Sequence, residues 1–269
     1  MNISVNGHTI YAYTGGKPFD AARPTVVFIH GVLNDHSVWI LQSRWFAHHG
    51  WNVLAIDLPG HCKSDGAPPS SVEEAAQAVI ALLDAAGIER AALVGHSFGS
   101  LIALETAARA PTRVSHLAMV GTAYPMKVSP ALLDASLNEP QKAIAMVNTF
   151  SHSTLAPPPS SLGPGTWLYG SSRALMRRVL NSNREANVFH VGFNACNNYA
   201  NGEAAIDALK CPVLFLLGAS DQMTMVSAAQ PLIQRARDAK VVKVQAGHAL
   251  MAEAPDAVLF ALADFLGAR

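Results

Sequence analysis

The fold is decided by the stretch AALVGHSFGSLIALETAARA, which occupies residues 91–110. Its first four residues are apolar and fit a buried strand, and residues 101–110 have the apolar spacing of a helix. Between them, the letters GHSFG place a glycine two positions before and two positions after Ser97. A tight turn from strand to helix favours glycines there, because neighbouring Cβ atoms would collide. The stretch therefore predicts a sharp turn that exposes the Ser97 hydroxyl at the start of a helix.

The same alternation of strand and helix continues through most of the chain. Short apolar runs bounded by turn residues predict central strands at 25–29, 52–56, 91–94, 114–120, 213–217 and 240–244. Ala-rich stretches with helical spacing predict helices at 37–49, 72–86, 97–110, 226–236 and 255–266. Fully apolar strands separated by helices are typical of a parallel sheet with helices on both faces. Residues 2–13 alternate around Asn6-Gly7 and predict an antiparallel hairpin at one edge.

One long segment, from about residue 123 to 203, has helical patches but no strand pattern. It also carries more aromatic residues than a linker needs, so we expect an inserted lid that packs over the ligand edge of the sheet. We predict that Tyr124, Trp167 and Phe193 line a substrate pocket. The predicted domains are an α/β core of residues 1–122 and 206–269 and a helical cap of residues 123–205.

Composition limits the partners and the compartment that we expect. Lys plus Arg and Asp plus Glu number 19 each, so no net charge attracts nucleic acid or anionic lipid, and a neutral or weakly charged small-molecule substrate is expected. The cysteines Cys62, Cys196 and Cys211 are odd in number and lack CxxC spacing, which indicates free thiols in a reducing compartment. The N-terminus lacks the pattern of a secretory signal and no apolar run is long enough to cross a bilayer, so a cytoplasmic protein is predicted.

A candidate base and a candidate acid follow the last two predicted strands. A serine hydroxyl is a weak nucleophile until a base removes its proton, and His248, after the strand at 240–244, is the best candidate. Asp221 follows the strand at 213–217 and would orient that histidine. The alternatives are that His248 and Asp221 only cap the helices that follow them. Asp57 also ends a strand, but it precedes Ser97 and is expected to brace its own turn.

Two backbone amides are predicted to bind an oxyanion. The Phe98 N–H lies at the start of the helix after Ser97, where the helix dipole favours negative charge. The second would be the Val32 N–H in the loop HGVL at residues 30–33, where Gly31 permits a close backbone approach. The alternative for this loop is a simple turn at the end of a strand. We expect His96 to pack rather than to react, and no metal site is expected because the histidines lack metal-ligand spacing.

These motifs together resemble the α/β-hydrolase family over nearly the whole chain. The resemblance covers FIHG at 28–31, DLPGH at 57–61, the turn around Ser97, and the loops that carry Asp221 and His248, in the family's order. It implies a mostly parallel eight-stranded sheet with a helical lid after the sixth strand. It also implies a serine hydrolase that needs no cofactor and that cleaves a carboxylic ester, or a similar acyl compound, through an acyl-enzyme.

Two departures from the family pattern narrow this expectation. Cys62 stands where the turn after Asp57 commonly has a second glycine, so we expect a different loop shape there. The loop at 30–33 lacks the HGGG run of many lipases, which favours a small-molecule hydrolase. A hydrolase of carbon–carbon bonds, a cofactor-free haloperoxidase or perhydrolase, an acyltransferase and a non-enzymatic binding module remain open as alternatives.

Overall fold

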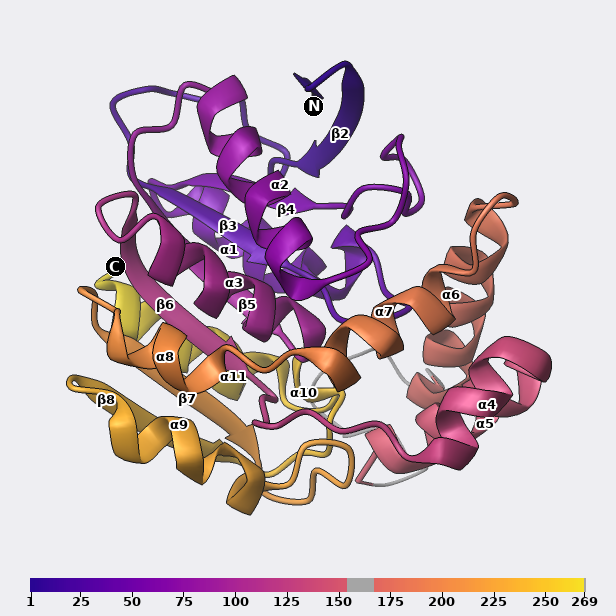
Figure 1. The fold of residues 1–269 in the computed structure, drawn as a ribbon. Helices are drawn as coiled ribbons and strands as arrows, with labels where there is room; N and C mark the ends of the chain where they lie inside the picture. The colour runs from indigo at the N-terminus through magenta and orange to yellow at the C-terminus, as the bar shows by residue number, and fades with distance from the viewer. Residues whose placement is uncertain (154–166, 269) are drawn as a thin grey trace.

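An eight-stranded sheet in the order β1-β2-β4-β3-β5-β6-β7-β8 forms the centre of the molecule in the computed structural model, which describes residues 1–153 and 167–268 (Figure 1). The strands are β1 (Asn2–Val5), β2 (His8–Tyr13), β3 (Thr25–Ile29), β4 (Asn52–Ile56), β5 (Ala91–His96), β6 (Val114–Val120), β7 (Val213–Gly218) and β8 (Ala239–Val244). The pairings from β4 through β8 are parallel, and β2 joins both β1 and β4 antiparallel. The predicted mostly parallel sheet of eight strands is confirmed.

The predicted strands agree closely with those of the structure. β3, β4 and β6 have the predicted bounds, whereas β5 extends two residues further, to His96. The hairpin of β1 and β2 turns at Asn6 and Gly7, which have φ of 51° and 84°. Such positive φ values at both turn residues give a turn whose twist matches that of the strands.

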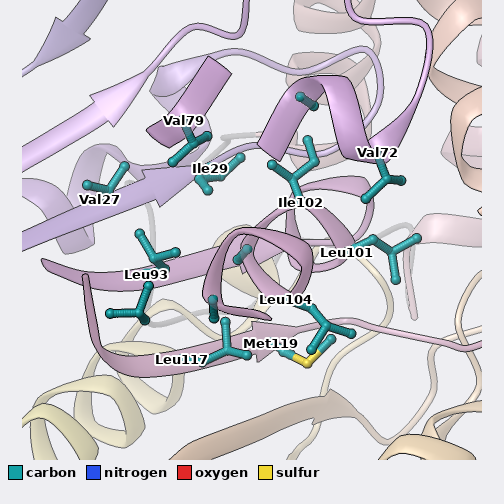
Figure 2. Close-up of a cluster of buried hydrophobic side chains, with 14 of the residues drawn as sticks. Val27, Ile29, Val72, Val79, Leu93, Leu101, Ile102, Leu104, Leu117 and Met119 are labelled. Carbon is teal, nitrogen blue, oxygen red and sulfur yellow. The ribbon is translucent and has the colours of Figure 1, made fainter. Parts of the chain in front are cut away.

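Helices cover both faces of the sheet, because the side chains of each buried strand alternate between two apolar clusters. The helices of the core are α1 (Ile40–His48), α2 (Val72–Ala85), α3 (Phe98–Arg109), α8 (Gly202–Asp207), α9 (Gln230–Arg235), α10 (Leu250–Glu253) and α11 (Pro255–Leu266), with 3₁₀ turns η1 (His36–Trp39) and η2 (Val226–Ala229). Val27 and Ile29 point to α2 and α3 (Figure 2), whereas Val26 and Phe28 point to the face covered by α1 and α11.

Among the described residues between β6 and β7, four helices precede α8, and we call them the cap: α4 (Pro130–Asn138), α5 (Pro140–Ser151), α6 (Leu168–Ser182) and α7 (Val188–Asn198). Figure 1 shows them gathered at one end of the sheet. They share an apolar cluster that includes Ile144, Val179 and Phe189 and that also takes in Leu33 of the core. α8 spans the predicted boundary at 205/206, and its residues Ala205 and Ile206 belong to the core cluster around α3. The division into a core and a 123–205 cap stays a prediction.

No helix among the described residues combines the length and the apolar character that crossing a membrane requires.

Candidate active site

Ser97 lies at a strained turn between β5 and α3. Its backbone has φ 53° and ψ −120°, outside the regions that non-glycine residues favour. Such a conformation costs about 1–3 kcal/mol and persists only where the surroundings impose it. Here the Ser97 N–H donates to Val120 O at 2.9 Å and the Ser100 N–H donates to Ser97 O at 2.8 Å. The turn is thus fastened to β6 on one side and to α3 on the other.

The glycines on either side of this turn have no room for a side chain. A Cβ at Gly95 would overlap the carbonyl of Gly99. A Cβ at Gly99 would lie 2.6 Å from the His30 oxygen and would overlap the Ile29 carbonyl. Helix α3 therefore approaches the end of β3 closely, which brings Ser97 beside the loop predicted to bind the oxyanion.

Asp221 and His248 lie in the loops that follow β7 and β8, and they are hydrogen bonded. The distance from His248 Nδ1 to Asp221 Oδ2 is 2.8 Å, and both side chains are buried. Because Nδ1 faces the carboxylate, Nε2 is the nitrogen that can take a proton from a serine. Gly121, with φ 55°, leaves space for the ring, since a Cβ there would lie 3.3 Å from Nδ1.

Three further donors hold the Asp221 carboxylate. The N–H groups of Met223 and Thr224 donate to Oδ1 at 2.8 Å each, and the Thr224 hydroxyl donates to Oδ2 at 2.7 Å. Burial alone would raise the pKa of Asp221, but the charge of His248 and these hydrogen bonds outweigh it and hold that pKa below its usual range. The role of Thr224 was not predicted from the sequence, although the side chains of aspartate and threonine often form such local hydrogen bonds.

His30 fixes the loop predicted to bind the oxyanion. Its Nδ1–H donates to Gly31 O at 2.8 Å, and its Nε2 accepts from Leu58 N at 3.1 Å, so one neutral tautomer satisfies both bonds. The N–H and C=O of one trans peptide point in opposite directions. By holding the Gly31 carbonyl, His30 therefore turns the Val32 N–H away from itself. That N–H has no acceptor within the part of the chain that the structure describes.

His96 contacts the loop that carries His248. Its Nε2–H donates to the His248 carbonyl at 2.9 Å, and the two ring centroids are 4.7 Å apart. His96 packs against Trp39, as expected, but it also holds the candidate base in place. No sequence pattern could have indicated this bond, since it joins residues 152 positions apart.

Ser97, His248, His96 and Val32 line one cavity of about 630 Å³, a size suited to a small-molecule ligand. The cap covers it with side chains of α5, α6 and α7. Most of the described lining is apolar: Val32, Val38, Ile40, Leu41, Val147, Leu168, Ala174, Leu175, Met176, Phe189, Phe193, Met223, Ala249, Met251, Ala252 and Pro255. The site is thus a mostly apolar chamber between cap and core, with the candidate serine and histidine in its wall.

The aromatic residues predicted for the pocket have different positions. Phe193, on α7, lines the cavity. Tyr124 does not belong to the described lining: it is buried against Gly202, and its hydroxyl donates to Ala200 O at 2.6 Å. Trp167 is also outside that lining, being 56% exposed and stacked on Tyr169. The structure therefore places Phe193 in the described lining and Tyr124 and Trp167 outside it, since the sequence does not reveal which side of a segment faces the cavity.

Asp57 braces its turn, as expected. One carboxylate oxygen accepts from the backbone N and from Nδ1 of His36, at 2.9 and 2.8 Å, and the other accepts from Lys63 N at 3.2 Å. Asp35, His36 and Asp57 place atoms of the kind that bind metals within 4.8 Å of one another. No sequence pattern indicated that these three residues would meet. Their polar atoms are used by each other and by Arg178, which pairs with Asp35 at 2.5 Å.

Cys62 has φ 47° at the position where the family pattern has a second glycine. This conformation costs a non-glycine residue about 1–2 kcal/mol. The backbone therefore adopts a left-handed conformation at this position without a glycine, and the loop is strained there. Burial raises the pKa of the Cys62 thiol to about 12, with a smaller contribution from Asp35. A thiol of this kind stays protonated and is a poor nucleophile.

Three buried histidines near the site are expected to make stability depend on pH. Burial lowers the pKa of His96 to about 3 and that of His61 to about 4, and it also lowers the pKa of His30. The unfolded chain binds these protons near pH 6.5, so stability is present above that pH and is lost as the pH falls toward 4. His96 and His61 each contribute a slope of up to about 1.4 kcal/mol per pH unit in this window, and His30 acts in the same direction.

Urea unfolding at a series of pH values measures this slope. In His61→Gln the free energy of unfolding should fall less steeply between pH 6.5 and 4 than in the wild type, by the share of one histidine. A wild-type stability that stays constant over this range would contradict the prediction.

Comparison with known proteins identifies the class. The family model described as the alpha/beta hydrolase fold matches residues 24–255, so the chain belongs to this family. A putative carbamate hydrolase, RutD, from Caulobacter sp. (strain K31) is 26% identical over 260 residues, which cover 94% of this chain and 93% of that protein.

Other similarities extend over less of the chain or show only the fold. The acetyltransferase component of the acetoin cleaving system from Pseudomonas putida is 36% identical over 110 residues, or 40% of this chain. The matched part spans only 28% of that relative's length. The enol-lactonase from Burkholderia xenovorans LB400 superimposes with a TM-score of 0.82, covering 99% of this chain and 100% of that one at 22% identity. At this identity the likeness shows the fold alone.

Proposed function

We propose that this chain is a serine hydrolase that cleaves carboxylic esters, or similar acyl compounds, of small molecules that are neutral or weakly charged. The observation that carries the proposal is the 2.8 Å hydrogen bond between Asp221 and His248, in a cavity that Ser97 also lines. The similarity to the putative carbamate hydrolase, which extends over 94% of this chain, supports hydrolysis of an acyl bond.

The proposed reaction has two steps. In the first, Ser97 Oγ attacks the carbonyl carbon while His248 Nε2 takes the hydroxyl proton, and the histidine then gives this proton to the leaving oxygen. In the second, water loses a proton to the same nitrogen, attacks the acyl carbon and releases the acid and Ser97. Asp221 holds the histidine in the required tautomer throughout, and no cofactor takes part.

The negative charge that develops on the carbonyl oxygen requires donors. We assign this role to the Val32 N–H, which His30 turns away from its own ring, and to the Phe98 N–H. Phe98 is the first residue of α3, where the helix cannot supply an acceptor for the amide. Removing one such donor typically costs about 100- to 1000-fold in kcat.

The lining of the cavity suggests the kind of substrate. Apolar side chains from α5, α6 and α7 line the same cavity as Ser97, so the acyl or alcohol part should be apolar. Phe193 is assigned to substrate binding on this basis. The three cysteines are free, which agrees with a reducing compartment, and we propose a cytoplasmic location.

A fluorophosphonate probe tests the proposed chemistry, because it reacts covalently with an activated serine. The expected result is stoichiometric labelling at Ser97, located by peptide mass spectrometry, and no labelling of the heat-denatured protein. A binding module without an activated serine would stay unlabelled, and that outcome would refute the proposal. Hydrolysis of acyl esters of graded length, lactones and vinylogous diketones then defines the substrate.

A further inference from the structure

Residues 151–153, at the end of α5, run directly along the loop that carries His248, and we call them the cap strap. The Ala249 N–H donates to Ser151 O at 2.9 Å. A Cβ at Gly247 would lie 2.7 Å from Ser151 O and 2.8 Å from Ser153 N, so the backbones touch without side chains between them. The cap and the loop of the candidate base are thus in direct contact.

The peptide bond after His248 is held on both sides. Its carbonyl accepts from His96 Nε2 at 2.9 Å, and its N–H, that of Ala249, donates to the cap strap. One holder belongs to the turn that carries Ser97, and the other belongs to the cap. A displacement of the cap strap would therefore move the backbone to which the His248 ring is attached.

Glu253 fastens the cap strap to this loop. Its side chain is buried, and its two oxygens accept from the Ser153 N–H at 3.0 and 3.2 Å and from the Gly247 N–H at 3.3 Å. The Ser153 hydroxyl also donates to it. These partners belong to the cap strap and to the residue before His248. A buried carboxylate can accept hydrogen bonds from the backbones of both segments and so hold them together, whereas an apolar side chain offers no acceptor.

We propose that Glu253 is a positioning residue that couples the cap to the catalytic histidine, by holding the cap strap against the loop of His248. The proposal rests on the function proposed above, in which His248 is the base. It gives the cap a second task besides covering the cavity: where the cap strap sits determines where His248 sits. Because a misplacement of about 1 Å at a reacting group can cost about 100-fold in rate, this contact affects kcat.

The experiment compares Glu253→Met with Glu253→Gln and with Glu105→Met as a matched control. Glu105 is also a buried carboxylate, and it binds Tyr199 and Asn201 at 2.8 Å each and Arg109 at 2.6 Å, outside the described lining of the cavity. Methionine has a similar length but no acceptor, whereas glutamine keeps one acceptor oxygen. Hydrolysis of the best ester of the substrate panel and the rate of fluorophosphonate labelling are measured for each full-length variant.

The expected result is a loss of about 10- to 100-fold in kcat and in labelling rate for Glu253→Met, with KM changed less than threefold. Glu253→Gln should recover most of this loss. Glu105→Met should keep kcat within about threefold of the wild-type value, even if its melting temperature falls as far as that of Glu253→Met. A Glu253→Met kcat no lower than that of the control would overturn the proposal. If that variant does not fold, Glu253→Asp replaces it, because its carboxylate is one methylene shorter and cannot reach both segments; a kcat and a labelling rate equal to those of the wild type would then overturn the proposal.

Hydrogen–deuterium exchange separates this proposal from the proposed function. Peptides covering residues 246–250 and 151–153 should exchange faster together in Glu253→Met, and not in Glu105→Met. Faster exchange in the cap strap alone would overturn the coupling. A wild-type protein that neither hydrolyses esters nor reacts with the probe would refute the function, and the exchange measurement would still decide whether Glu253 joins the two segments.

Discussion

Replacing Ser97 by alanine is expected to lower the kcat for ester hydrolysis by roughly 10⁴- to 10⁶-fold while the fold is retained. The hydroxyl is the atom that would form the acyl-enzyme, and Ser97 stands on the strained turn before α3, in the wall of the cavity that His248 also lines. A small rate above that in water should remain, because the amides of Val32 and Phe98 would still stabilise the oxyanion.

The measurement is the steady-state hydrolysis of a short p-nitrophenyl ester, with the melting temperature as the check on the fold. Replacing a serine that caps a helix usually destabilises the protein, because the hydrogen bond from its side chain to the helix is lost. Ser97 precedes α3 but makes no such bond, so only a small change in stability is expected. A variant that hydrolyses the ester within tenfold of the wild type would show that Ser97 is not the nucleophile.

Replacing Asp221 by asparagine is expected to lower kcat by about 10⁴-fold, the second largest effect. The carboxylate accepts the Nδ1–H of His248 at 2.8 Å and is held by the N–H groups of Met223 and Thr224. In asparagine these two donors keep the amide oxygen as their acceptor, which turns the NH₂ toward the histidine. The ring would then adopt the other tautomer, with a proton on Nε2, and could not accept the proton of Ser97.

Asp57→Asn is the matched control for this substitution. Asp57 is also a buried aspartate at the end of a strand, but it binds His36 and Lys63 rather than His248. We expect Asp57→Asn to retain kcat within about tenfold and to lower the melting temperature. A larger loss of kcat in Asp57→Asn than in Asp221→Asn would contradict the assignment of the acid.

Much of the fold could be predicted because it follows from local patterns. Buried parallel strands read as short continuous apolar runs, and β3, β4 and β6 have the bounds that these runs predict. The turn around Ser97 was recognisable because only glycine fits at residues 95 and 99. The order of the candidate triad could be inferred for a similar reason: loops after parallel strands meet at one edge of the sheet, wherever they stand in the chain.

The cap could be located but not oriented from the sequence. A segment without strands between β6 and β7 indicated an insertion, yet of the three aromatic residues expected in the pocket only Phe193 belongs to its described lining. An aromatic residue in a loop or a helix of such a segment can face a cavity, a neighbouring helix or solvent, and the local sequence is compatible with each. Phe193 faces the cavity because α7 packs against the apolar cluster of the cap.

The sequence by itself thus determined the sheet, the strained turn at Ser97 and the candidate residues Asp221 and His248, since glycine sterics and strand order are local or topological properties. Only the tertiary structure decided what holds them: His30 on Gly31, His96 on the His248 carbonyl, and Glu253 between the cap strap and the histidine loop. The contacts of His96 and of Glu253 join segments that lie far apart in the chain. Packing alone selects which polar atoms meet there.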